Sequence, residues 1–159
     1  VNDAPVISDV TSQDVEEDGL FTYTLSAFDI DGDDITYSAE SDGNSVVNIS
    51  NNLLTVTPDA DYNGDILVTV TVSDGEYSDS DEFTLSVTAV NDAPVVASPI
   101  EDLDVDEDSD DVVIDLRDVF DDVENGGDLA FSFSENVAAM EASLNGSILT
   151  LSFLADQNG

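Results

Sequence analysis

The chain has 159 residues, of which 38 are Asp or Glu and one, Arg117, is basic, so its formal net charge is −37 at pH 7. This charge excludes nucleic acid and anionic membrane surfaces as partners, because both would repel it. The sequence contains no Cys and no His, which excludes disulfides, thiolate zinc sites and a Ser-His-Asp triad. No apolar run is long enough to span a bilayer, so we expect no direct insertion into a membrane.

Apolar and polar residues alternate through residues 1–90, and this period of two predicts strands rather than helices. Asp-Gly and Asn-Gly pairs between the alternating stretches indicate tight turns. Short strands that each have one apolar face predict an all-β fold, an antiparallel β-sandwich. The predicted strands cover residues 5–10, 21–27, 35–40, 46–50, 53–57, 66–73 and 83–89. The same alternation assigns Phe21, Tyr23, Phe83, Phe131 and Phe133 to the core, and leaves Tyr62 and Tyr77 as candidate surface aromatics.

The sequence repeats itself: the hexapeptide Val1-Asn2-Asp3-Ala4-Pro5-Val6 returns as Val90-Asn91-Asp92-Ala93-Pro94-Val95. A repeat of this length indicates tandem domains rather than a solenoid. The other matching segments are 14–18 with 104–108, 29–31 with 122–124, 35–38 with 129–132, 54–56 with 149–151, and 60–64 with 155–159.

Residues 65–90 hold two predicted strands and have no counterpart in the second repeat. We therefore predict a complete sandwich over residues 1–90, a linker over 91–95, and a second domain over 96–159 that lacks its last two strands. We also expect the chain to be a piece of a longer protein, because residue 1 already lies inside a repeat.

Acidic residues cluster in the segment 29–34, where four of six residues are Asp. An isolated Asp-Gly pair is explained by turn formation, but neighbouring carboxylates repel each other by about 1 kcal/mol per pair at 4 Å in water. With a single basic residue in the chain, only a bound cation or dissolved salt can compensate. Calcium prefers the oxygen ligands that this sequence has in excess, whereas zinc and copper prefer the absent His and Cys.

An EF-hand is the alternative for this cluster, because Asp29, Asp31, Asp33 and Glu40 match the first, third, fifth and twelfth positions of its loop. Asp34, however, stands at the sixth position, where the EF-hand requires Gly. Residues 35–40 also alternate like a strand instead of forming a flanking helix. We therefore reject the EF-hand.

The whole chain resembles two consecutive cadherin-like repeats of the bacterial extracellular kind, the second being similar to the dystroglycan-type cadherin-like variant. The resemblance rests on the linker 90–95, on the Asp29-Ile30-Asp31 loop that leads into 35–38, and on the segments 57–64 and 70–75. It implies a seven-strand Greek-key sandwich in each domain, in agreement with the number of strands that the alternation predicts.

The resemblance also implies Ca²⁺ as the cofactor, because cadherins hold calcium between successive domains. The implied junction ligands are Glu17, Asp59 and Asp61 from the first domain, Asn91 and Asp92 from the linker, and Asp122 and Glu124 from the second domain. Glu124 departs from the Asp-x-Asp pattern of the family. At the other end of the first domain, which we call its upper end, the implied ligands are Asn2, Asp3, Asp29, Asp31 and Asp74.

We therefore expect a calcium-dependent structural and adhesive repeat of a large extracellular or cell-surface protein, with calcium stiffening the junction between domains. Its partners would be neighbouring repeats of the same polypeptide and a homophilic or polysaccharide ligand. We expect no enzymatic activity, because a sandwich of this size offers no cleft for a carboxylate pair such as Asp59 and Asp61. Two alternatives stay open: a carbohydrate-binding module of a secreted polysaccharide-degrading enzyme, and a filament or assembly subunit completed by strand donation.

Overall fold

The structure is a computed structural model that describes residues 1–106, 109–126, 128–135 and 140–153. It divides into two units, Val1–Val90 (unit 1) and Asn91–Gly159 (unit 2). Apart from one short 3-10 helix, the regular structure of the described residues is β, which confirms the predicted fold class. The matches that involve residues 107–108 and 155–159 lie outside the described part. No described helix has the length and apolarity needed to cross a bilayer.

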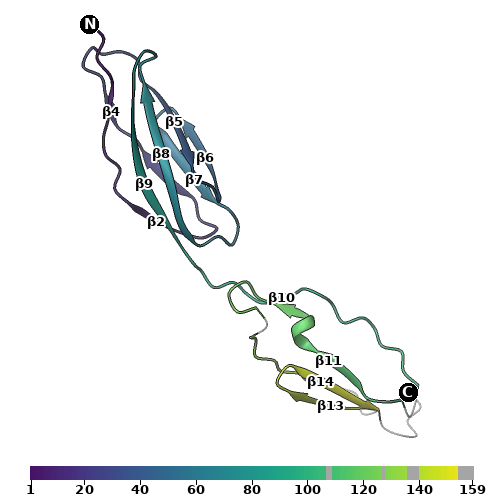
Figure 1. Ribbon diagram of the computed structural model, residues 1–159. Helices are drawn as coiled ribbons and strands as arrows, with labels where there is room; N and C mark the ends of the chain where they lie inside the picture. The colour runs from purple at the N-terminus through teal and green to yellow at the C-terminus, as the bar shows by residue number, and fades with distance from the viewer. Residues whose placement is uncertain (107–108, 127, 136–139, 154–159) are drawn as a thin grey trace. The chain divides into compact units, whose positions relative to one another are not determined.

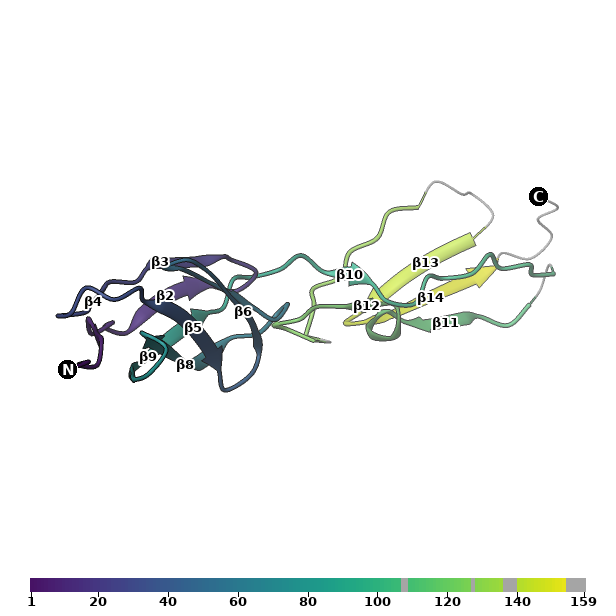
Figure 2. The same cartoon turned by 90° about the horizontal axis from the view of Figure 1, so that it is seen from above.

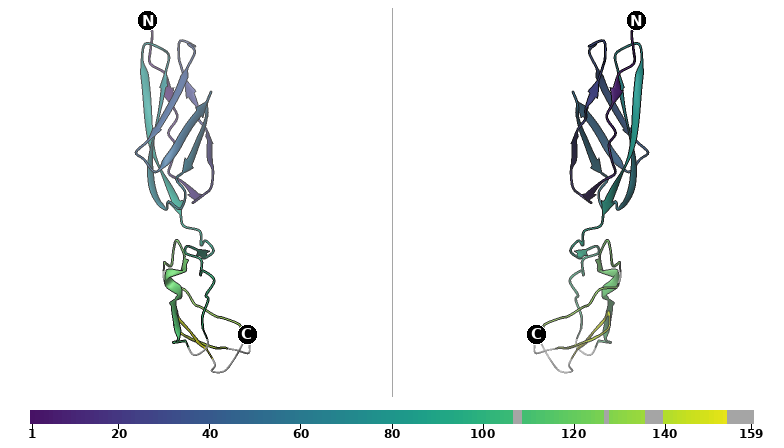
Figure 3. Two further views of the ribbon diagram at one scale, coloured as in Figure 1. Left: turned by 90° about the vertical axis from the view of Figure 1, so that its right-hand side faces the viewer. Right: turned by 90° about the vertical axis from the view of Figure 1, so that its left-hand side faces the viewer.

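Unit 1 is a sandwich of two sheets and a small ribbon (Figure 1). One sheet has the order β2-β9-β8-β5, the other has the order β3-β7-β6, and the ribbon pairs β1 with β4. The long strands of unit 1 run along its length (Figure 3). Its strands are β1 (Val6–Ile7), β2 (Gln13–Glu16), β3 (Phe21–Thr24), β4 (Ala27–Phe28), β5 (Thr36–Ser41), β6 (Ser45–Ser50), β7 (Leu53–Pro58), β8 (Gly64–Ser73) and β9 (Ser78–Thr88).

The core of unit 1 lies between the two sheets, because alternate residues of each strand point inward. On β8 these are four fully buried residues, Ile66, Val68, Val70 and Val72. The rings of Phe21 on β3 and Phe83 on β9 lie 6.0 Å apart between centroids and join the two layers. Burying a Val, Leu, Ile or Phe side chain stabilises a fold by about 1.5–3 kcal/mol. The alternation of apolar residues therefore decides which face of each strand lies in the core.

The first strand of the sandwich changes sheets, and one of its pairings is parallel. β1 pairs with β4 in the ribbon, whereas β2 pairs with β9 in parallel, where the sequence predicted only antiparallel strands. Between these two pairings the backbone is held by carboxylates of β9. Asp79 accepts a hydrogen bond from the Ile7 N–H (3.1 Å), and Asp81 accepts one from the Val10 N–H (2.6 Å). These side chains take the place of main-chain carbonyls where the chain crosses from one sheet to the other.

Unit 2 reproduces two of the three β-assemblies of unit 1 (Figure 2). The ribbon β10-β12 corresponds to β1-β4, and the sheet β11-β14-β13 corresponds to β3-β7-β6. The described residues contain no counterpart of the sheet β2-β9-β8-β5. The elements of unit 2 are β10 (Val95–Val96), β11 (Val112–Asp115), η1 (Leu116–Asp118), β12 (Phe120–Asp121), β13 (Met140–Asn145) and β14 (Ile148–Phe153).

The prediction that Phe133 belongs to the core is wrong, since 43% of this residue is exposed. By the repeat matching, its counterpart in unit 1 is Ala39 on β5, which packs against the core and pairs with Val70 of β8. Residues 128–135 form no strand, so Phe133 is not held against a core in this way. Tyr77 is 46% exposed, in line with its prediction as a surface aromatic, whereas Tyr62 packs against the core of unit 1.

The carboxylate of Asp81 gives a direct test of how the first strand is held. Asp81→Ala should lower the free energy of unfolding of unit 1 by about 1–3 kcal/mol, because the Val10 N–H loses its acceptor. Asp81→Asn keeps an acceptor oxygen and should lose less than half as much. All four Tyr residues lie in unit 1, so urea unfolding followed by tyrosine fluorescence reports on this unit. The exposed Asp9→Ala is the matched control, and equal losses for Asp9→Ala and Asp81→Ala would contradict the assignment.

Candidate metal centre

The acidic segment that follows β4 forms a tight loop, which we call the acidic loop (residues 29–33). Asp29 directly follows the strand and is 6% exposed, whereas Asp31 and Asp33 are exposed. Asp29 Oδ1 accepts hydrogen bonds from the backbone N–H groups of Asp31 (2.8 Å), Gly32 (3.0 Å) and Asp33 (3.3 Å). Gly32 has a φ of 80°, a conformation that glycine adopts without strain. One oxygen of Asp29 therefore closes the loop around itself.

The other oxygen of Asp29, Oδ2, is buried and has no hydrogen-bond partner. A buried carboxylate oxygen without a partner costs about 1–3 kcal/mol or more. Ligand oxygens of Asp29, Asp31 and Asp33 lie within 4.8 Å of one another, and carboxylates this close repel. Unit 1 has no Lys or Arg to offset that repulsion, and Arg117 of unit 2 pairs with Asp115 (2.5 Å). An orphaned buried oxygen beside two exposed carboxylates is a donor set that fits a hard cation such as calcium.

The first residues of unit 1 are hydrogen-bonded to two loops at this end. The backbone N–H of Asp3 donates to Asp31 Oδ2 (2.8 Å), and Asn2 Nδ2 donates to Asp74 Oδ2 (3.0 Å). Asp74 Oδ1 accepts two further bonds from the backbone N–H groups of Tyr77 and Glu76, which hold the pKa of Asp74 below its ordinary value.

Of the five residues predicted as upper-end ligands, two, Asp29 and Asp31, belong to the carboxylate cluster. Asp3 reaches Asp31 through its backbone, and Asn2 reaches Asp74 through its side chain. The cluster also includes Asp33, which belongs to the acidic segment 29–34 but is not among the upper-end ligands that the resemblance implies. Asp33 joins because Gly32 allows a turn in which its backbone N–H faces Asp29.

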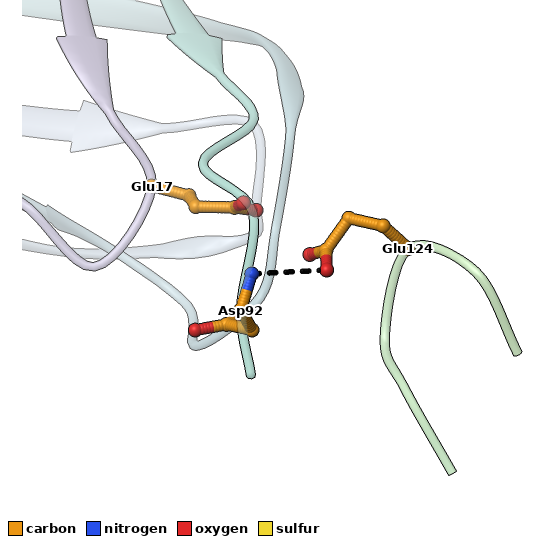
Figure 4. Close-up of side chains that lie close together, drawn as sticks. All are labelled: Glu17, Asp92 and Glu124. Atoms are coloured by element: carbon orange, nitrogen blue, oxygen red, sulfur yellow. Dashed lines mark hydrogen bonds between the residues drawn. The ribbon is translucent and has the colours of Figure 1, made fainter. Parts of the chain in front are cut away.

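At the opposite end of unit 1 lies Glu17, whose side chain is drawn in Figure 4. It is 4% exposed. Its Oε1 accepts a hydrogen bond from the Val90 N–H (2.5 Å), and its Oε2 accepts one from Asn63 Nδ2 (3.5 Å). The predicted ligands Asp59 and Asp61 are both exposed. Asp61 approaches Asp18, which the sequence did not single out: the Asp61 N–H donates to Asp18 Oδ1 (3.4 Å). Asp18 and Asp61 both have a positive φ, 58° and 57°, and this loop conformation is not encoded by residue spacing.

The predicted ligands of unit 2 lie in two groups. In the first, the Asp92 N–H donates to Glu124 Oε2 (3.1 Å), the bond that is drawn in Figure 4, and Asn91 Nδ2 donates to the Asp92 carbonyl (2.6 Å). In the second, Asp122 is 5% exposed and its Oδ1 accepts bonds from both the backbone and the side chain of Asn125 (2.8 and 2.9 Å). Like Asp29, Asp122 is a buried acid that closes the loop following it.

Solved structures similar to the chain include a hypothetical protein associated with carbohydrate metabolism, a glycoside hydrolase and a cadherin. A nucleoside hydrolase-related hypothetical protein of Saccharophagus degradans, associated with carbohydrate metabolism, is 19% identical with a TM-score of 0.49, over 55% of this chain and 26% of that one. An endo-fucoidan hydrolase of glycoside hydrolase family 107 is 20% identical with a TM-score of 0.47, over 95% and 24%. Drosophila N-cadherin is 18% identical with a TM-score of 0.47, over 56% and 35%. The chain thus spans about a quarter of the length of the first two.

No curated protein matches the sequence. A family described as bacterial Ig domain matches residues 2–88, which are nearly the whole of unit 1 and more than half of the chain. The sandwich described above has the fold expected for an Ig-like repeat. The chain therefore belongs to the bacterial Ig domain family.

Proposed function

We propose that the chain is a calcium-binding structural repeat of a longer extracellular protein, in which calcium orders the upper end of unit 1. The observation that carries this proposal is Asp29 Oδ2, a buried carboxylate oxygen without a hydrogen-bond partner beside the exposed carboxylates of Asp31 and Asp33. A cation between them would supply the missing partner and cancel the repulsion. No enzymatic activity is assigned to the chain.

Calcium is favoured over other metals by the donor atoms of the acidic loop. All of them are oxygens, and calcium accepts carboxylates, carbonyls and waters in flexible geometry. Magnesium demands a stricter octahedral arrangement and keeps most of its waters. Because calcium is abundant outside cells, the proposal places the chain at a cell surface or in a secreted protein, in keeping with the usual location of bacterial Ig domains.

Ion binding would connect segments that are distant in the sequence. The acidic loop is bonded to the first residues of the chain through Asp3, and those residues are bonded to the β8–β9 turn through Asn2 and Asp74. Fixing the acidic loop therefore fixes the end of the sandwich. Because calcium would bind only the ordered loop, it would stabilise the folded state by about 2.7 kcal/mol at a concentration of about 100 times its Kd.

Calcium should raise the midpoint of urea unfolding of unit 1, as followed by tyrosine fluorescence, and EDTA should reverse the change. Asp29→Asn keeps the loop-closing Oδ1 but removes the charge, so it should weaken calcium binding at least about tenfold, equivalent to about 1.4 kcal/mol. Without calcium the same variant should be as stable as the parent or more stable, because a repelling charge is gone. Asp33→Asn should act in the same direction.

The exposed Asp14→Asn is the matched control for charge, since Asp14 lies outside the acidic loop. It should leave the calcium response of the parent unchanged. A calcium-independent unfolding midpoint in the parent would contradict the proposal. Equal calcium responses of Asp29→Asn and Asp14→Asn would also contradict it.

A second part of the proposal rests on the cadherin-like resemblance. Calcium would restrict bending between the units and make successive repeats a stiff rod. Its ligands would be Glu17, Asp59, Asp61, Asn91, Asp92, Asp122 and Glu124. On the same resemblance we propose that the second repeat is of the dystroglycan-type cadherin-like variant and that the chain has a role in adhesion.

Small-angle scattering tests the stiffening. Calcium should narrow the distribution of particle dimensions of the chain, and EDTA should broaden it again. Asp92→Asn combined with Glu124→Gln removes two charges without changing side-chain size and should abolish this response. The calcium-induced stabilisation of unit 1 should persist in the double variant, which separates this test from that of the acidic loop. Identical scattering of the parent with calcium and with EDTA would refute the stiffening.

Carbohydrate binding is a second candidate function, favoured by one observation. Phe28, the residue before Asp29, is 66% exposed on β4, and its cross-strand neighbour Val6 is 60% exposed. An exposed aromatic ring beside oxygen ligands is a surface on which a sugar ring can stack.

Electrophoresis through gels containing a neutral β-glucan should retard the parent but not Phe28→Ala. Tyr77→Ala, which removes another exposed aromatic ring, is the matched control and should be retarded like the parent. If the β-glucan does not retard the parent, carbohydrate binding is contradicted and the structural repeat remains the proposed function.

A further inference from the structure

The longest run of the sequence without a charged residue coincides with the hairpin of β6 and β7. Unit 1 contains 20 acidic residues, yet residues 43–58, which include both strands and their turn, contain none. The second longest such run, residues 142–155, covers most of the β13–β14 hairpin, its counterpart in unit 2. A chain with a net charge of −37 therefore leaves the same hairpin uncharged in both repeats.

The outer face of the sheet β3-β7-β6 is uncharged across all three strands. Two rows of side chains cross it: Thr22, Thr55 and Asn48 in one, and Thr24, Leu53 and Ser50 in the next. On the outer face of the other sheet every strand carries an exposed acid: Asp14 on β2, Glu82 on β9, Asp65 on β8 and Glu40 on β5. A second anionic protein can thus approach the first face closely, whereas the other face repels it.

The strand β6 is an edge of this uncharged sheet and lacks the features that usually protect an edge. Among the described residues it pairs with β7 alone. Natural edge strands are protected by charged side chains, Pro, bulges or short length, whereas β6 has six residues with no charge and no Pro. The edges of the other sheet, β2 and β5, carry acids, and β3 has only four residues. Of these four edges, β6 is the one best suited to accept a further strand.

The turn that follows β6 shows which of its backbone groups are free. A two-residue turn, Asn51-Asn52, joins Ser50 to Leu53, and the residues that flank such a turn exchange hydrogen bonds. Bonded and non-bonded positions alternate along an antiparallel pair. The N–H and C=O groups of Val47 and Ile49 therefore point to the open side of β6, where an added strand would meet them.

We propose that β6 pairs with β6 of a second copy of this chain, antiparallel and about a two-fold axis at Asn48. Val47 of each copy would exchange backbone hydrogen bonds with Ile49 of the other, and the two Asn48 amides would meet on the uncharged face. Antiparallel pairing places Asp42, which precedes β6, beside the uncharged turn of the other copy, whereas parallel pairing would bring the two Asp42 carboxylates together. This contact needs no calcium and goes beyond the proposed calcium-binding function.

The charge of the chain is the reason for choosing a second copy as the occupant. A cationic partner would be attracted to the acidic surfaces instead of to this face. Another copy is repelled by those same surfaces, so the uncharged hairpin is where two copies meet with least repulsion. Pairing of six-residue strands buries less than the about 800 Å² per partner of a standard complex. We therefore expect a weak contact, which successive repeats of one polypeptide would reinforce.

Sedimentation of the full chain in EDTA tests the contact apart from calcium binding. The parent should form dimers as its concentration rises to about 1 mM. Raising NaCl from about 50 to about 500 mM should increase the dimer fraction, because salt screens the repulsion between two anionic chains. Asn48→Asp places two acids at the two-fold axis and should weaken dimerisation about tenfold. Ser80→Asp adds the same charge at an exposed position of β9 in the other sheet, and this matched control should dimerise like the parent.

Cysteine cross-linking tests the geometry of the contact. The chain has no Cys, so a single introduced thiol can link only to its own equivalent. Residues that face each other at a non-hydrogen-bonded antiparallel position have Cα atoms about 4.5 Å apart, a separation that a disulfide can span. Asn48→Cys should therefore give a covalent dimer on mild oxidation, whereas Ser80→Cys should stay monomeric.

Four results would overturn the proposal. The parent could stay monomeric at every concentration and salt level, or Asn48→Asp could dimerise as strongly as the parent. Equal cross-linking of Asn48→Cys and Ser80→Cys would show that the copies meet elsewhere or at random. A monomeric parent whose β6 amide signals shift when a neutral β-glucan is added would identify a glycan as the occupant of this face.

Discussion

The structure depends on negative charge that has almost no basic side chain to balance it. The constraint is strongest at Asp29, where the fold buries a carboxylate, uses one of its oxygens to close the acidic loop and leaves the other without a hydrogen-bond partner. Two further carboxylates stand within 4.8 Å. In a chain with one basic residue, the repulsion between these carboxylates is offset by no Lys or Arg of unit 1, and a bound cation would relieve it. The proposed dependence on calcium follows from this unbalanced negative charge.

Besides forming the candidate metal centre, carboxylates of this chain accept hydrogen bonds from backbone N–H groups. Asp79 and Asp81 hold the first strand where it changes sheets, Glu17 holds the Val90 N–H, and Asp122 closes a loop in unit 2. Such charge-assisted bonds are stronger than neutral ones. Acidic residues therefore stabilise the turns and crossings of the sandwich, and only a subset of them remains available for an ion.

The sequence predicts those features that depend on neighbouring residues. Alternation locates β7, β8 and β9 and their buried faces, and the turn at Gly75 follows from its Asp-Gly pair. The parallel pairing of β2 with β9 is not predictable in this way, because it depends on a strand that changes sheets. The cadherin-like resemblance implies Asp29 and Asp31 as ligands, and the acidic segment 29–34 also contains Asp33. Asp18 is not singled out, because its position depends on loop conformation. Phe133 is mispredicted because its burial depends on strands outside its own segment.

The central claim is that the acidic loop binds calcium through Asp29, and amide chemical shifts test it most directly. The N–H groups of Gly32 and Asp33 donate to Asp29 Oδ1, so an ion on the same carboxylate must change their environment. The account predicts that these two signals shift saturably as calcium is added to the full chain, while those of Ser50 and Asn51 in the β6–β7 turn stay fixed. Signals of Gly32 and Asp33 that stay unchanged, or that drift linearly together with all others as ionic strength rises, would contradict it.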